Sequence, residues 1–178
     1  LAIILFLALC LGNPFEGECL KKYTIVDEQA EYEMFGSNPV YIYSDIDTSN
    51  RPIRGYHTAV LNRYPLLPSY IKAAFHHSFV DGLKDRENGR TTELEWLKLL
   101  CKFRDELITC SCCGKEYIFG FSEKKHNDKC PYCKKETRKF CYLTIGKSRV
   151  LLEPNKNLYE IHIDKYSPNY NKRVGKVI

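Results

Sequence analysis

The sequence has little methionine and no long apolar run. Met34 is the only methionine in 178 residues, and the longest apolar stretch covers residues 1–11. A helix needs about 20 apolar residues to cross a bilayer. We therefore predict no contact with a membrane and a cytoplasmic location. Because the chain begins inside this apolar stretch, we also expect it to be an internal fragment of a longer protein.

Residues 1–11 also lack the flanks of a secretory signal. Such a signal has an initiating methionine, a basic stretch before the apolar run and a small-x-small cleavage site after it. None of these is present, since the sequence GNPFEG follows directly at residues 12–17. We predict a helix buried on nearly all sides, as at the centre of a larger domain. A clipped signal peptide is the alternative.

The charge is uneven along the chain. Residues 1–107 hold 12 basic and 15 acidic side chains, and residues 108–178 hold 15 and 7. This shift indicates a boundary near residue 108. A basic segment invites a nucleic-acid interpretation, but no stripe of lysine and arginine alternates with stacking aromatics. We therefore do not expect nucleic acid to be a partner.

Two helices are predicted before this boundary. The first follows Pro68, has its apolar positions Ile71, Phe75 and Phe79 at helical spacing, and ends near Gly82.

The second helix opens with a capping box, in which Thr92 and Glu95 satisfy each other's free amides. Trp96 then starts an apolar stripe that we expect to pack on the preceding helix. The stripe continues through Leu100, Phe103 and Leu107.

Two Cys-x-x-Cys pairs, Cys110 with Cys113 and Cys130 with Cys133, are separated by 16 residues, a spacing typical of a zinc ribbon. Two intervening residues let a tight turn aim both sulfurs at one ion, and Gly114 suits the left-handed position of such a turn. Four thiolates complete a tetrahedron, so we predict a structural Zn²⁺ site with no open position for substrate.

Other uses of the cysteines remain as alternatives. Disulfides conflict with the odd count of nine and with the missing secretion signal. A redox pair needs only one Cys-x-x-Cys motif in a thioredoxin-like unit. Cys112 or His126 could replace one of the four ligands. We expect the remaining cysteines to be free thiols: Cys10, Cys19, Cys101 and Cys141.

The last segment reads as β structure. Residues 140–145, 149–152 and 158–163 are predicted strands, separated by turns at 146–148 and 154–157. We expect His162 to lie on the strand surface and the sheet to be incomplete.

Several motifs together resemble a group of bacterial serine/threonine protein-kinase-like proteins. These are GNPFEG at 12–17, FGSNPVYIY at 35–43 and DRENGRTTE at 85–93. Phe15 matches the turn after the central helix of the kinase C-lobe. Arg90 matches the arginine that pairs with the glutamate of the Ala-Pro-Glu motif. Trp96 lies in the final helix.

The resemblance covers most of residues 1–135 and implies an α+β chain in three parts. Residues 1–107 would be the last helices of a kinase-like C-lobe truncated at its N-terminus. Residues 108–137 would be a zinc ribbon, and residues 138–178 the incomplete start of a small β domain.

The resemblance also implies that the parent protein transfers the terminal phosphoryl group of ATP to protein hydroxyls. ATP and Mg²⁺ would be its cofactors, and a protein substrate and a phosphatase or other signalling protein its partners. This chain has no His-Arg-Asp or Asp-Phe-Gly string, so we expect it to be inactive alone. The alternative function is a zinc-ribbon adaptor that binds protein or nucleic acid.

Overall fold

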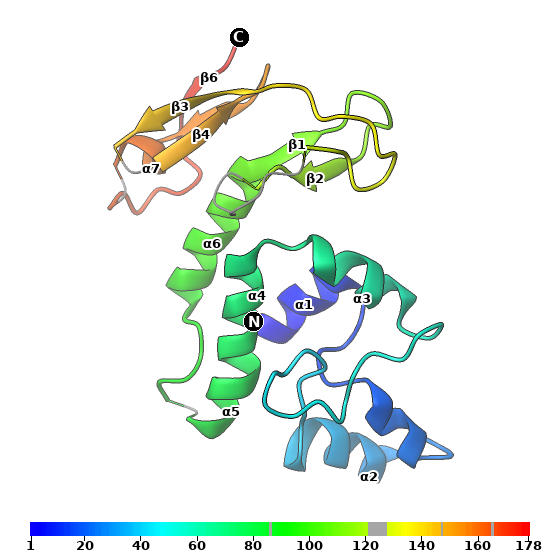
Figure 1. Ribbon diagram of the computed structural model, residues 1–178. Helices are drawn as coiled ribbons and strands as arrows, with labels where there is room; N and C mark the ends of the chain where they lie inside the picture. The colour runs from blue at the N-terminus through cyan, green and yellow to red at the C-terminus, as the bar shows by residue number, and fades with distance from the viewer. Residues whose placement is uncertain (86, 121–127, 147, 165) are drawn as a thin grey trace. The chain divides into compact units, whose positions relative to one another are not determined.

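The computed structural model describes residues 1–85, 87–120, 128–146, 148–164 and 166–178, and these form two compact units (Figure 1). The first unit is Leu1–Trp96 and the second is Leu97–Ile178. Helices and small antiparallel sheets make up the described chain, which confirms the predicted α+β class.

Short helices build the first unit. They are α1 (Ala2–Cys10), η1 (Glu18–Lys22), α2 (Glu28–Glu31), η2 (Tyr32–Ser37), α3 (Thr58–Arg63), η3 (Tyr64–Leu66), α4 (Ser69–His76), η4 (His77–Asp81), α5 (Gly82–Lys84) and the start of α6 (Glu93–Glu106). The elements α4, η4 and α5 follow one another without a break. The predicted helix after Pro68 is therefore confirmed, and it continues two residues beyond Gly82.

An aromatic cluster forms the core of the first unit. Phe75 lies 5.1 Å from Phe6 in an edge-to-face arrangement and 5.7 Å from Phe79 in a stacked one, measured between ring centroids. Phe15 meets Phe79 edge to face at 5.2 Å, and the Trp96 ring lies 5.1 Å from Phe75. Such pairs add about 0.5–1.5 kcal/mol each beyond the burial of their area. The core therefore joins α1, the 12–17 turn, α4, η4 and α6.

Helix α1 is covered on one face only. Phe6 and Cys10 are buried, and burial raises the pKa of the Cys10 thiol to about 12. In contrast, Ile4 is 67% exposed and Ile3 and Leu7 more than 40% exposed. The prediction of a helix buried on nearly all sides is wrong for this structure, because the aromatic core contacts one face and no other described element of the first unit covers the opposite one.

The capping box of α6 is confirmed. The Thr92 amide donates to Glu95 Oε2 at 2.8 Å, and the Glu95 amide donates to Thr92 Oγ1 at 3.3 Å. Of the predicted apolar stripe, only Trp96 is fully buried, while Leu100 and Phe103 are half-buried. The helix ends at Glu106, so the last residue of the stripe begins a strand instead.

The second unit contains three separate two-stranded antiparallel sheets among its described residues. β1 (Leu107–Thr109) pairs with β2 (Glu116–Ile118), β3 (Cys141–Ile145) with β4 (Ser148–Leu152), and β5 (Asn157–Tyr159) with β6 (Arg173–Lys176). The predicted strands at 140–145 and 149–152 are confirmed. The third predicted strand stops at Tyr159 and continues as the short helix α7 (Glu160–Ile163).

His162 lies in α7 and is buried, so its predicted surface position is wrong. Its imidazole faces the carboxylate of Asp105 near the end of α6. This contact accounts for the burial of the His162 side chain. No helix in the described part of the chain combines the length and the apolar character that crossing a bilayer requires.

Candidate metal centre

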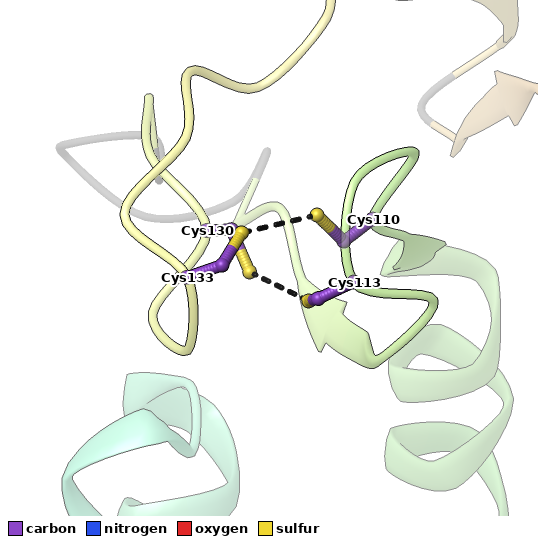
Figure 2. Close-up of side chains that lie close together, drawn as sticks. All are labelled: Cys110, Cys113, Cys130 and Cys133. Carbon is purple, nitrogen blue, oxygen red and sulfur yellow. Dashed lines mark hydrogen bonds between the residues drawn. The ribbon is translucent and has the colours of Figure 1, made fainter.

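The structure brings the four cysteines of the two Cys-x-x-Cys motifs together. The sulfurs of Cys110, Cys113, Cys130 and Cys133 all lie within 4.8 Å of one another. Figure 2 shows the two side chains of one loop facing the two of the other loop. The Cys110 and Cys133 sulfurs are 3.6 Å apart, and those of Cys113 and Cys130 are 3.7 Å apart.

The first loop is a tight turn between β1 and β2. The Cys110 amide donates to the Lys115 carbonyl at 3.0 Å, and the Gly114 amide donates to the Cys110 carbonyl at 2.9 Å. Gly114 has φ +69°, a left-handed conformation that glycine adopts without steric strain. The Cys112 amide points at Cys110 Sγ, 3.4 Å away. The turn therefore directs the sulfurs of Cys110 and Cys113 into one cluster, as the sequence predicts, and directs the Cys112 amide toward Cys110 Sγ.

The second loop repeats this geometry twenty residues later. The Cys130 amide donates to the Lys135 carbonyl at 2.9 Å, and the Lys134 amide donates to the Cys130 carbonyl at 3.0 Å. Lys134 takes the left-handed position with φ +62°. A hydrogen bond of 2.7 Å between the Tyr117 hydroxyl and Thr137 Oγ1 joins the flanks of the two loops.

Backbone amides and neighbouring sulfurs shift the pKa values of the cysteine thiols in opposite directions. The N–H groups of Cys113 and Cys112 lower the pKa of the Cys110 thiol to about 6, so this sulfur is largely a thiolate at neutral pH. For Cys133 the amide of Lys135 also lowers the pKa. Desolvation and hydrogen bonds with the neighbouring sulfurs outweigh it and raise the pKa to about 12. The site thus holds a preformed negative charge and protons that a cation would displace.

Two of the sulfur–sulfur distances fit a tetrahedral metal ion, and all of them lie within 4.8 Å. Zinc–sulfur bonds of about 2.3 Å in a tetrahedron place neighbouring sulfurs about 3.8 Å apart, close to the 3.6 and 3.7 Å observed. A disulfide needs about 2.05 Å, and all nine cysteines are free thiols. The four cysteines can therefore hold a metal ion.

Cys112 and His126 were the two alternative ligands predicted from the sequence. Cys112 is exposed and lies outside the four-cysteine group, which is the only such cluster among the described residues. His126 lies outside the described residues. The cluster therefore consists of the cysteines of the two Cys-x-x-Cys motifs and does not include Cys112.

The three residues singled out for structural roles differ in their surroundings. Phe15 and Trp96 are buried in the aromatic core, 6% and 1% exposed. Arg90 is exposed, and within the described chain it forms no ion pair. Its pairing with a glutamate stays a prediction.

Asn50 has a structural role that was not predicted from the sequence. Its side chain is 3% exposed. The amide group donates to the carbonyls of Phe15 and Val40, both at 2.7 Å, and its Oδ1 accepts from the Cys19 amide at 2.9 Å. Asn50 therefore ties the 12–17 turn to two distant segments. No motif signals this role, because its partners lie 10 to 35 residues away.

No protein-family model, curated protein or solved structure matches this chain.

Proposed function

We propose that residues 108–137 are a structural zinc ribbon in which Cys110, Cys113, Cys130 and Cys133 bind one Zn²⁺. The observation that carries this proposal is the approach of the four sulfurs within 4.8 Å on two matching turns. Four thiolates satisfy a tetrahedral ion, which leaves no position for substrate and gives the ion a structural role. Iron also accepts four thiolates, so the test must identify the metal.

Elemental analysis of the purified chain provides this test. We expect one zinc per chain and a colourless protein, whereas thiolate-bound iron would absorb visible light. Cys113→Ser and Cys133→Ser should each lose the metal. Cys112→Ser is the matched control and should keep it, because Cys112 lies outside the cluster. A chain without metal, or with these sulfurs joined in disulfides, would refute the zinc site.

We also propose that the chain is the C-terminal part of a cytoplasmic serine/threonine protein-kinase-like protein. Support comes from the resemblance of residues 12–17 and 85–93 and from the buried position of Phe15. Asn13 Oδ1 accepts from the Phe15 amide at 2.9 Å, so the turn after α1 is closed locally while Phe15 packs on Phe79. The resemblance implies a turn of this sequence after the central helix of the C-lobe.

The parent would transfer the terminal phosphoryl group of ATP, with Mg²⁺, to a protein hydroxyl. A phosphatase or another signalling protein would be a further partner. Phosphoryl transfer needs an aspartate to accept the hydroxyl proton and side chains to hold magnesium. The motifs that carry them are absent from this sequence. The chain alone should be inactive.

Incubation with radiolabelled ATP and a general protein substrate tests this assignment. The chain alone should incorporate no label, and a longer protein that contains it should carry His-Arg-Asp and Asp-Phe-Gly strings upstream. Phosphorylation by these 178 residues alone would contradict the assignment. Salt-sensitive binding to generic DNA would instead favour a zinc-ribbon adaptor, because phosphate contacts release counterions.

A further inference from the structure

The tail, residues 138–178, shares a hydrophobic core with two of the four cysteines. Leu151 of β4 has no exposed surface and belongs to one cluster with Ile108, Tyr117 and the two buried cysteines, Cys110 and Cys130. Each of these cysteines is the first of its loop. The tail therefore supplies part of the apolar surface against which both metal loops pack.

A second contact joins the tail to the strand that leads into the first loop. Lys156 Nζ donates to the carbonyls of Asp105 and Leu107, at 2.5 and 3.2 Å. Asp105 is in the last turn of α6, where free carbonyls attract cations. Leu107 is the first residue of β1, and β1 ends one residue before Cys110. Lys156 thus anchors the strand that positions the first metal ligand.

A third contact holds α7 against the end of α6. The Tyr159 amide donates to His162 Nδ1 at 3.1 Å, so the imidazole proton lies on Nε2 and is donated to Asp105 Oδ2 at 2.8 Å. The two side chains are only 5% and 12% exposed. The Arg104 guanidinium covers the Tyr159 ring at 3.8 Å. We call Lys156, Tyr159 and His162 the tail latch.

We infer that metal binding at the four cysteines and docking of the tail are thermodynamically coupled. This inference rests on the proposed zinc site. The docked tail holds β1 and the loop core in the geometry that binds metal, so metal should bind more tightly when the latch is closed. Coupling is reciprocal, so the metal should stabilise the docked tail by the same factor, although none of the four proposed ligands lies in the tail.

Zinc titration of the full chain against a chromophoric chelator measures the first half of this coupling. Lys156→Met and Leu151→Ala should each weaken zinc binding roughly tenfold, within the usual range of coupling between sites. The matched controls are Lys139→Met and Leu143→Ala, which make the same changes at exposed positions of the tail. Both should bind zinc within about twofold of the wild type, because neither residue belongs to the latch or the loop core.

Hydrogen exchange of the wild-type chain measures the other half of the coupling, the stabilisation of the docked tail by metal. This measurement does not require any variant to fold. Removal of zinc with EDTA should speed amide exchange in β5, α7 and β6. If the wild type binds zinc but all four variants bind equally well and exchange in the tail is unchanged, the coupling is rejected and the zinc ribbon stands. A wild type that binds no zinc rejects both.

Discussion

At the scale of single residues, Asn50 joins separate segments of the first unit through three hydrogen bonds. Asn50→Ala removes three hydrogen bonds and leaves two carbonyls and one amide without this partner. Each buried polar group left unsatisfied costs about 1–3 kcal/mol, so we expect the free energy of unfolding to fall by about 3 kcal/mol. Urea unfolding followed by Trp96 fluorescence measures this change. Asn38→Ala, at an exposed asparagine, should shift stability by less than about 0.5 kcal/mol; equal effects would contradict the role of Asn50.

Cys110 adds one step to the pH dependence expected for zinc binding at this site. The amides of Cys113 and Cys112 hold the pKa of its thiol at about 6, so near pH 7.5 zinc displaces no proton from this sulfur. Below pH 6 the thiol is protonated, and zinc must displace one proton more. Zinc affinity should therefore fall as pH falls. Below pH 6 it should fall by an additional factor of about ten per pH unit. Zinc titrations between pH 5 and 8 measure this, and a constant slope across the range would refute it.

At the scale of elements, the capping box fixes where α6 begins. Thr92→Ala removes the oxygen that accepts the Glu95 amide and should destabilise the first unit by about 1 kcal/mol. Thr48→Ala makes the same change at an exposed loop position and should have little effect. Thermal unfolding of both variants, followed by Trp96 fluorescence, compares them. An unchanged melting temperature for Thr92→Ala would show that packing alone sets the start of the helix.

The sequence predicts those elements whose signals are local. The capping box spans four residues, the helix after Pro68 repeats at helical spacing, and each metal loop is set by one Cys-x-x-Cys motif. The buried position of His162 was not predicted, because its partner Asp105 is 57 residues away in the sequence. The alternation of Tyr159, Ile161 and Ile163 is typical of a strand, but residues 160–163 form α7, in which His162 contacts Asp105. The exposed face of α1 was missed because an apolar sequence alone does not show what covers it.

At the scale of the whole molecule, the candidate metal site lies within one of the two units. The four cysteines lie in Leu97–Ile178, while the single tryptophan, Trp96, packs on Phe75 in the first unit. Removal of zinc with EDTA should lower the melting temperature of the second unit, because a structural zinc site supplies folding free energy of order 10 kcal/mol. The fluorescence of Trp96 should still report the original transition of the first unit.

Differential scanning calorimetry with and without EDTA, alongside Trp96 fluorescence, separates these transitions. A single transition that shifts as a whole would contradict the division of the chain into two units.

The two metal loops have the same hydrogen-bond pattern twenty residues apart, so their equivalent positions can be compared directly. Gly114 and Lys134 occupy twin positions with nearly the same left-handed φ, 69° and 62°, yet only one of them is glycine. A side chain at such a position costs about 1 kcal/mol in backbone strain. The second loop thus carries a backbone strain that the first avoids, so this position favours opening of the second loop over opening of the first.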